Sequence, residues 1–457
     1  MKSIEFLDRI KETKRIKQSL QLKQPVFIVL YGRRRCGKST LMRHIMGKDD
    51  IYYQADQQEE IYQRDAFARE IAYKFPSFDK VVYPSWESFF FGLNMRMKKN
   101  STLFIDEFPF LVRSSPALPS IVQKLIDSKS LTYNIVICGS SQQMIQGLVL
   151  SSDEPLYGRA DEIIRITPMK IHWLQKSMNT TAINTVEEYA LWGGVPRYWE
   201  MRKKYKTLEE AMKMLLLDTS SILYEEPMRL FLDDMRSAVQ AYTIMSIIGG
   251  GVHRSSEIAA RLEKPATFIS RPLANLIQMD YLKKEIPFGE NEKNSKKSLY
   301  KIKDPYLSFY FRYIVNNKSR IEADKSQEVY TDIKKTISIY LGDVWESLSR
   351  DFVTHSNIQN IKWDTAKRWW GKGIDHKEME IDILADSIDK KYILIGECKW
   401  SDKADIQLLS NQLDYKIKNL SFAKNKKIVK VLFLKNSSYK SKDINIIHPD
   451  ILIKTMH

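Results

Sequence analysis

Residues 26–40 of this 457-residue chain read VFIVLYGRRRCGKST, an apolar stretch that runs directly into a glycine-bounded basic loop. The apolar stretch predicts a buried strand, and residues 41–46 predict a helix. This is the strand–loop–helix context in which the spacing G-x-x-x-x-G-K-[ST] forms a phosphate-binding P-loop. The residues expected to cradle the phosphates are Gly32, Arg33, Arg34, Arg35, Cys36, Gly37, Lys38, Ser39 and Thr40.

The loop chemistry predicts ATP and Mg²⁺ as ligands. Inward-turned backbone N–H groups and the dipole of the following helix attract phosphate oxygens. Lys38 is expected to reach the β- and γ-phosphates, and the Ser39 hydroxyl is expected to bind Mg²⁺. The alternative is a chance match in a basic loop, which the flanking strand and helix disfavour.

A second apolar stretch, residues 102–105, ends in the acid pair Asp106 and Glu107. Unpaired buried charge is costly, so packing alone does not explain two acids at the end of a buried strand. We expect Asp106 to bind Mg²⁺ through water and Glu107 to orient and deprotonate the attacking water. A glutamate directly after the aspartate favours hydrolysis. An exposed strand end is the alternative interpretation.

Three further positions have two interpretations each. Ser140 and Ser141 follow the apolar stretch 134–138, and either serine is a candidate γ-phosphate sensor or a helix N-cap. Arg159 is a candidate phosphate-sensing or finger arginine, or a member of a structural salt bridge. The Gly-Gly-Val-Pro segment at 193–196 is a candidate hinge or an ordinary loop.

These motifs carry a family resemblance over nearly the whole chain. The matching segments are residues 6–9, 31–40, 104–107, 139–141, 155–159, 193–196 and 304–307. The sequence resembles the prokaryotic, archaeal-type P-loop ATPases that are related to AAA and STAND NTPases. That resemblance implies ATP binding, a winged helix and a C-terminal domain like restriction endonucleases of the PD-(D/E)XK type.

Residues 236–315 have the pattern of a winged helix-turn-helix: three short helices and then a hairpin. The third helix, residues 266–279, would enter a major groove of DNA. Pro272 removes a hydrogen bond there and is expected to kink or shorten this helix. Packing between domains is the alternative use. The exposed candidates for DNA contact are Thr267, Ser270, Arg271 and Asn275 in the helix and Lys293, Lys296 and Lys297 in the wing.

In the C-terminal region, residues 378–384 and 392–400 predict a hairpin that carries Asp382, Glu397 and Lys399. A turn near residues 388 and 389 would set Asp382 opposite Ile395 and diagonal to Glu397. Asp…Glu-x-Lys is typical of nuclease-like domains, in which both carboxylates bind Mg²⁺ and the lysine stabilises transition-state charge. Glu346 on the preceding helix and Gln412 on the following helix match further positions of such domains. Surface salt bridges, or binding without cleavage, are the alternatives.

Composition sets the outer bounds of the interpretation. Lys and Arg outnumber Asp and Glu by 72 to 56, so the net charge is +16. An anionic partner such as DNA is expected, and a charged surface that only keeps the protein soluble is the alternative. Three cysteines cannot form a disulfide framework, and no apolar run is long enough to span a membrane. We therefore expect a cytoplasmic protein without membrane contact.

The expected fold class is a multidomain α/β protein. Its predicted parts are a P-loop ATPase core (1–175), a helical subdomain (176–235), a winged helix-turn-helix (236–315) and a nuclease-like α/β domain (319–457). The expected function is an ATPase whose nucleotide state controls DNA engagement by the C-terminal half. An NTP-gated signalling or defence scaffold and a DNA-binding regulator with a vestigial ATPase are the alternatives. A homo-oligomer or a protein partner is left open.

Overall fold

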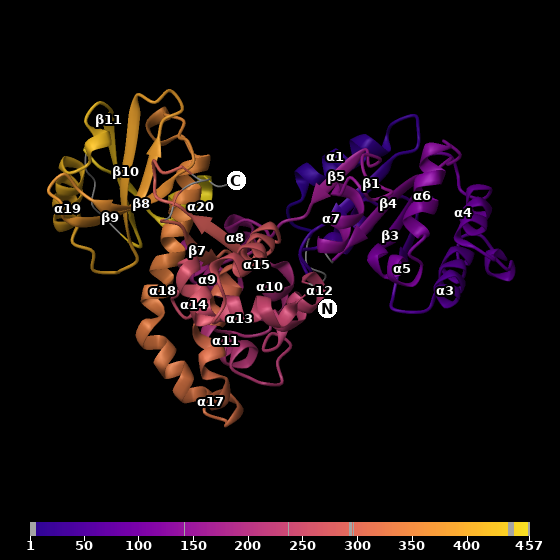
Figure 1. Ribbon diagram of the computed structural model, residues 1–457, viewed down its shortest axis with the longest axis horizontal. Coiled ribbons are helices and arrows are strands. Elements are labelled where there is room, and N and C mark those ends of the chain that lie inside the picture. Colours follow the sequence, from indigo (N-terminus) through magenta and orange to yellow (C-terminus); the bar gives the residue numbers. More distant parts are fainter. Residues whose placement is uncertain are drawn as a thin grey trace. The chain divides into compact units, whose positions relative to one another are not determined.

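The computed structural model describes residues 6–140, 142–235, 237–291, 295, 297–436 and 443–455. Contacts divide the chain into two compact units (Figure 1). Unit 1 comprises Met1–Met169, Val195–Arg197 and Leu230–Arg236, and unit 2 comprises Lys170–Gly194, Tyr198–Arg229 and Ser237–His457. Of the predicted residues, Ser141, Lys293 and Lys296 lie outside the described ranges.

Unit 1 is built on a parallel sheet with the strand order β2-β3-β4-β1-β5. Its strands are β1 (Phe27–Tyr31), β2 (Ile51–Gln54), β3 (Thr102–Asp106), β4 (Asn134–Gly139) and β5 (Glu162–Arg165). Val29 and Leu30, adjacent residues on opposite faces of β1, are both fully buried. Burial of both faces is typical of a parallel sheet whose crossovers are helical. The predicted parallel α/β fold is therefore confirmed for this unit.

Helices connect the strands of unit 1 and supply its core. They are α1 (Ile10–Leu20), α2 (Lys38–Ile45), α3 (Glu60–Ala72), α4 (Trp86–Asn94), α5 (Phe108–Ser114), α6 (Leu118–Asp127) and α7 (Gln142–Leu150), with a short 3₁₀ turn η1 (Phe78–Lys80). Phe67 of α3 and Phe89 of α4 are fully buried in one cluster with Val29 of β1. Strand β4 lies between β1 and β3, so it separates the strand before the basic loop from the strand that ends in Asp106.

Unit 2 begins with helices and a two-stranded hairpin. The helices are α8 (Ile171–Met178), α9 (Ala182–Trp192), α10 (Pro196–Arg202), α11 (Leu208–Leu216), α12 (Glu226–Asp234), α13 (Ala238–Gly249), α14 (Ser255–Arg261) and α15 (Ala266–Gln278), of which α10 and α12 also enter unit 1. The antiparallel hairpin consists of β6 (Leu282–Glu285) and β7 (Leu299–Ile302). The predicted order of three helices and a hairpin is confirmed. Pro272 lies inside α15 and does not end it.

The C-terminal part of unit 2 is a mixed sheet flanked by helices. The strand order is β12-β11-β10-β9-β8, with β8 (Lys367–Lys372), β9 (Glu378–Asp386), β10 (Tyr392–Lys399), β11 (Lys427–Leu434) and β12 (Asn445–Ile447). The 30-residue helix α18 (Ser326–His355) contacts β9 and β10, and Trp345 Nε1 donates a hydrogen bond to the Phe433 carbonyl at 3.0 Å. The remaining helices are α16 (Pro305–Phe309), the π-helix η2 (Tyr310–Ile314), η3 (Val315–Asn317), α17 (Lys318–Glu322), η4 (Ile358–Asn360), α19 (Ile406–Lys418), η5 (Ser421–Ala423) and α20 (Pro449–Thr455).

The register of the β9–β10 hairpin differs from the predicted one. Ile395 pairs with Leu384 and Gly396 with Ile383, so Asp382 lies opposite Glu397 by continuation of the ladder. We expected Ile395 to face Asp382. The prediction centred the turn near residues 388 and 389, whereas the strand pairs and a 3.0 Å hydrogen bond from Ser387 N to the Tyr392 carbonyl centre it on residues 389 and 390, one residue later.

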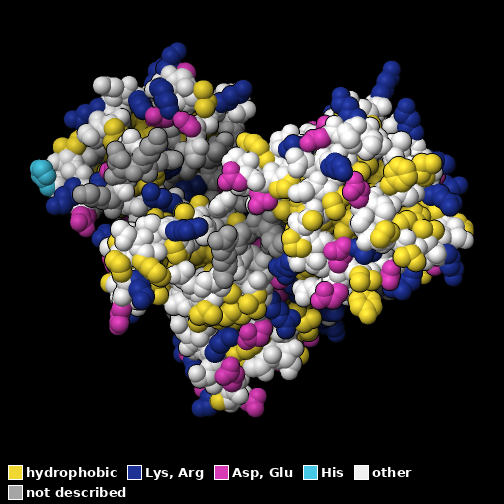
Figure 2. Space-filling view, turned by 45° about the vertical axis from the view of Figure 1, so that its right-hand side comes forward, with side chains coloured by type: hydrophobic (Ala, Val, Ile, Leu, Met, Phe, Trp, Pro, Cys, Tyr) yellow, Lys and Arg dark blue, Asp and Glu magenta, His cyan; other side chains and the backbone are white. Residues whose placement is uncertain are grey.

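Figure 2 shows Lys and Arg side chains spread over the visible face and interspersed with Asp and Glu. On this face the excess positive charge is therefore not gathered into one patch. Among the described residues, no helix is both long and apolar enough to cross a membrane.

Candidate nucleotide site and C-terminal carboxylate site

The loop after β1 folds around its own lysine. Lys38 Nζ donates hydrogen bonds to the carbonyls of Gly32 at 2.7 Å and Arg33 at 3.0 Å, and the lysine is only 5% exposed. Arg9 fixes the loop from outside, because its guanidinium donates to the Cys36 carbonyl at 2.9 Å. The cation that is expected to meet phosphates is thus held inside the loop by backbone oxygens.

Gly32 is required by close packing as well as by backbone conformation. Its φ is +147°, and a Cβ at this position would lie 2.1 Å from the carbonyl oxygen of Ile166. Ile166 N in turn donates to the Tyr31 carbonyl at 2.7 Å, so the segment after β5 lies against the start of the loop. No side chain fits at Gly32 without moving this backbone.

The acid pair lies at the end of β3, as predicted, and both carboxylates have internal partners. Asp106 is almost fully buried and accepts a 2.6 Å hydrogen bond from the Tyr52 hydroxyl. Glu107 has a left-handed backbone (φ 54°), and its carboxylate accepts hydrogen bonds from Ser140 N at 3.1 Å and Ser140 Oγ at 2.9 Å. Ser140 therefore contacts the expected catalytic base directly.

Cys138 on β4 shows that the loop and the acid pair share one electrostatic environment. Burial raises the pKa of this thiol well above its usual value, the negative charges of Asp106 and Glu107 raise it further, and the charge of Lys38 opposes them. The structure thus brings together Lys38, Asp106 and Glu107, which lie far apart in the sequence.

Other predicted residues of unit 1 have partners of their own. Arg34 forms a 2.7 Å ion pair with Asp233. Arg159 binds Asp127 at the end of α6 through three hydrogen bonds of 3.0–3.1 Å. That arrangement matches the structural salt bridge that is one of the two interpretations of Arg159, and a sensing role stays a prediction.

The Gly-Gly-Val-Pro segment meets the Asp-Pro segment of the sequence. A Cβ on Gly193 would lie 3.3 Å from Asp304 Oδ2 and from Pro305, and Gly193 has a φ of +56°. The chain passes from unit 2 to unit 1 between Gly194 and Val195. The hinge assignment for this segment stays a prediction.

In unit 2, three predicted carboxylates lie within electrostatic reach of one another. Burial and the neighbouring charge of Asp382 raise the pKa of Glu397 to about 7, and the same two causes raise the pKa of Glu346. Asp382 Oδ2 accepts a 2.9 Å hydrogen bond from the Cys398 backbone N–H. Glu346, Asp382 and Glu397 therefore form a group of acids on α18, β9 and β10, which we call the carboxylate site.

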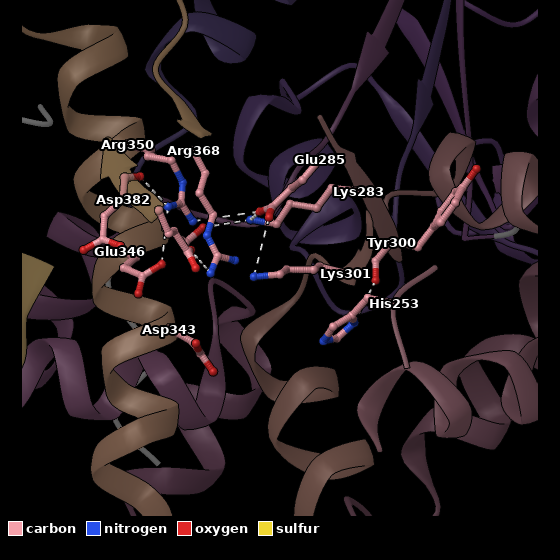
Figure 3. Close-up of polar contacts among 12 residues, drawn as sticks. His253, Lys283, Glu285, Tyr300, Lys301, Asp343, Glu346, Arg350, Arg368 and Asp382 are labelled. Carbon is pink, nitrogen blue, oxygen red and sulfur yellow. Dashed lines mark hydrogen bonds and ion pairs between the residues drawn. The ribbon is translucent and has the colours of Figure 1, made fainter. Parts of the chain in front are cut away.

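Two cations compensate this charge. Lys416 Nζ on α19 forms a 2.7 Å hydrogen-bonded ion pair with Glu397. The guanidinium of Arg350 donates to the Asp382 carbonyl at 2.9 Å and lies 3.4 Å from Glu346 (Figure 3). The predicted cation, Lys399, is exposed at the end of β10. Among the described residues, no group of three or more His, Cys, Asp or Glu is arranged to hold a metal ion.

Sequence reasoning missed three residues that contact the predicted carboxylates: Arg350, Lys416 and Tyr52. Arg350 follows Glu346 by four residues on α18. Because side chains four residues apart on a helix are neighbours, this spacing could have predicted the pair. Lys416 reaches Glu397 from a separate helix, and Tyr52 reaches Asp106 from a neighbouring strand, so only the tertiary fold identifies them.

Two family models match separate parts of the chain. The family described as "ATPase domain predominantly from Archaea" matches residues 6–201, and one described as "Archaea bacterial proteins of unknown function" matches residues 310–414. An uncharacterized protein of Methanocaldococcus jannaschii is 32% identical over 410 residues, which cover 88% of each chain.

One solved structure, with a TM-score above 0.5, supports the fold of the ATPase part. The Walker-type ATPase of Pyrococcus abyssi is similar with a TM-score of 0.52 and 20% identity, covering 67% of this chain and 96% of that one. The ORC2 protein of Aeropyrum pernix, in its ADPNP–ADP complexes, is similar with a TM-score of 0.49 and 12% identity, covering 70% of this chain and 95% of that one. The chain therefore belongs to the family of the M. jannaschii protein and carries an archaeal-type ATPase domain of P-loop fold, followed by a C-terminal domain of the matched family of unknown function.

Proposed function

We propose that unit 1 binds ATP with Mg²⁺ at residues 32–40 and hydrolyses it. The observation that carries this proposal is the meeting of Lys38, Asp106 and Glu107 around Cys138. A cation at a phosphate loop and a carboxylate pair on a nearby strand are the parts that phosphoryl transfer to water requires.

The roles follow from the donor chemistry. The Ser39 hydroxyl and the Asp106 carboxylate offer the oxygen ligands that Mg²⁺ prefers. Lys38 exchanges the carbonyls of Gly32 and Arg33 for phosphate oxygens when the nucleotide binds. Glu107 is the general base, and Ser140 orients it through two hydrogen bonds.

Glu107→Gln tests this assignment, because it removes the general base and keeps the size and shape of the side chain. We expect ATP to bind normally and steady-state hydrolysis to fall by roughly a hundredfold or more. Glu87→Gln is the matched control, because Glu87 is exposed and pairs only with Lys124 in the described contacts. Hydrolysis by Glu107→Gln at the wild-type rate would refute the assignment.

As a second function, we propose that Asp382 and Glu397 of the carboxylate site bind a divalent cation and that this site acts on nucleic acid. The observation that favours it is the raised pKa of Glu397, since Asp382 and burial together disfavour its charged form. A divalent ion would relieve that repulsion, and both side chains supply oxygen ligands.

Mn²⁺ tests the second function in two assays. We expect Mn²⁺ to raise the melting temperature of the full-length protein and to support nicking of duplex DNA. Asp382→Asn should remove both effects, whereas Asp389→Asn in the exposed turn should keep them. A protein that shows neither effect has a purely structural carboxylate site.

The helix–hairpin segment is the proposed winged-helix contact to DNA. Thr267, Ser270 and Arg271 are exposed on α15, as a groove-facing surface requires. We expect Arg271→Ala to weaken duplex binding and reduce its salt dependence, because a phosphate or base contact is lost. Unchanged affinity at low salt would favour packing as the role of this segment.

A further inference from the structure

A cavity of about 710 Å³ lies within unit 2, and it borders the carboxylate site through Arg350, which lines the cavity and also contacts Glu346. The β6–β7 hairpin, the glycines at the end of α13 and one side of α18 line it. Its volume falls in the range of small-molecule sites, roughly 300–1,000 Å³. Neither the P-loop residues nor Asp382 and Glu397 line this cavity.

Basic side chains predominate in the described lining of the cavity. Lys283, Lys301, Lys303, Arg312 and Arg350 contribute positive charge, against the carboxylates of Glu285, Asp343 and Asp351. Two of the cations are closely paired: Arg312 with Asp343 at 2.8 Å, and Lys303 with Asp280 at 2.7 Å.

The other three cations converge on one carboxylate (Figure 3). Glu285 lies 2.8 Å from Lys283 Nζ, 3.5 Å from Lys301 Nζ and 3.9 Å from Arg350 Nη2. Although burial alone raises the pKa of Glu285, the three cations together hold it well below its usual value. One carboxylate cannot neutralise three cations, although Arg350 also lies 3.4 Å from the carboxylate of Glu346.

Lys301 is the most weakly compensated of the three. It lies directly across the hairpin from Lys283, an arrangement of like charges that is destabilising in a sheet. Its 3.5 Å distance to Glu285 Oε2 exceeds that of a charge-assisted hydrogen bond, about 2.7–2.9 Å. The ammonium therefore retains donor capacity on the cavity side of β7.

We propose that this cavity binds a small phosphate-bearing anion through Lys301, Lys283 and Arg350. The planar guanidinium and the two ammonium groups can share several phosphate oxygens. Glu285 limits the affinity, because its negative charge competes with the ligand for the same cations. The phosphate has two chemical sources, a free small molecule and the terminal phosphate of a nucleic-acid strand.

Inorganic pyrophosphate is the probe, titrated by calorimetry into the full-length Lys38→Ala protein so that binding at residues 32–40 is suppressed. In this background Lys301→Met should weaken binding by roughly tenfold, as expected for one charge-assisted contact. Glu285→Gln should tighten it by a similar factor. Lys301→Arg should retain binding, and Lys284→Met, on the other face of β6, should leave it unchanged.

Lys301→Met should lower the affinity for pyrophosphate, and Glu285→Gln should raise it. These opposite changes in affinity distinguish a binding site from a structural ion network. No pyrophosphate binding, or equal affinity with and without Lys301, would overturn the proposal. A 5′-phosphorylated oligonucleotide that displaces pyrophosphate, where its 5′-hydroxyl counterpart does not, identifies a strand end as the source. If neither oligonucleotide displaces pyrophosphate, the result supports a free small-molecule anion as the ligand. Equal displacement by the two oligonucleotides would contradict a site for a single phosphate group.

Discussion

The proposed nucleotide site of unit 1 and the carboxylate site of unit 2 both bury charge, but they compensate it differently. In unit 1 the loop satisfies its own cation, because Lys38 donates to two carbonyls no more than six residues away. In unit 2 the compensating cations, Lys416 and Arg350, come from helices that flank the strands bearing Glu397 and Asp382. The spacing of residues in the sequence therefore predicts the loop around Lys38. The partners of Glu397 and Asp382 depend on how the helices pack against the strands.

Gly32→Ala should have the largest effect on stability. The new methyl group would meet the Ile166 carbonyl, and the backbone at φ +147° disfavours any side chain. We expect a loss of about 3 kcal/mol in the free energy of unfolding, measured by urea denaturation. Gly147→Ala is the control: it lies in α7 with open space around its Cβ position, so alanine should be neutral or stabilising there.

Lys416→Met tests the compensation in unit 2. The variant leaves the Glu397 carboxylate without its 2.7 Å partner, and we expect a loss of about 1–2 kcal/mol at neutral pH. Adding Glu397→Gln should restore most of this loss, because the uncompensated charge is gone. A double mutant no more stable than Lys416→Met would mean that the lysine acts through packing alone.

The pH dependence of stability gives a third test. The pKa of Glu397 is 4.5 in the unfolded chain and about 7 in the folded one, so the folded protein binds more protons between these values. Stability should therefore fall as pH rises from about 4.5 to about 7. Melting temperatures of Glu397→Gln should depend less on pH in this window, and an unchanged slope would contradict the assignment.

Arg159→Ala should have the smallest effect on stability. Arg159 and Asp127 form a partly exposed ion pair, and such pairs contribute about 0–1 kcal/mol. If Arg159 is purely structural, ATP hydrolysis should stay near the wild-type rate. A large loss of hydrolysis with unchanged stability would instead support the predicted sensing role.

Much of the fold was predictable because its signals are local. The strand–loop–helix at 26–46, the strand that ends in Asp106 and the order of α13, α14 and α15 follow from periodicity and turn residues. The β9–β10 register was predicted wrongly by two positions. Register depends on how Ser387 closes the turn, which alternation of apolar residues cannot specify.

The sequence predicted the charged residues of the candidate sites, but it did not predict the residues that form hydrogen bonds or ion pairs with them. Asp106, Glu107 and Lys38 stand out as charges at the ends of apolar strands and in a glycine loop. The hydrogen bonds of Tyr52 to Asp106 and of Lys416 to Glu397 join elements that are distant in sequence. Such contacts are set by strand order and helix packing, so a single sequence cannot reveal them.

Equilibrium binding of ATP in the presence of Mg²⁺ to the wild type and to Lys38→Ala tests the central claim most directly. The account predicts saturable binding by the wild type and by the surface control Lys124→Ala. Lys38→Ala should lose binding while keeping the wild-type melting temperature within a few degrees. Equal ATP affinity in the wild type and Lys38→Ala would contradict the assignment of residues 32–40 as the nucleotide site.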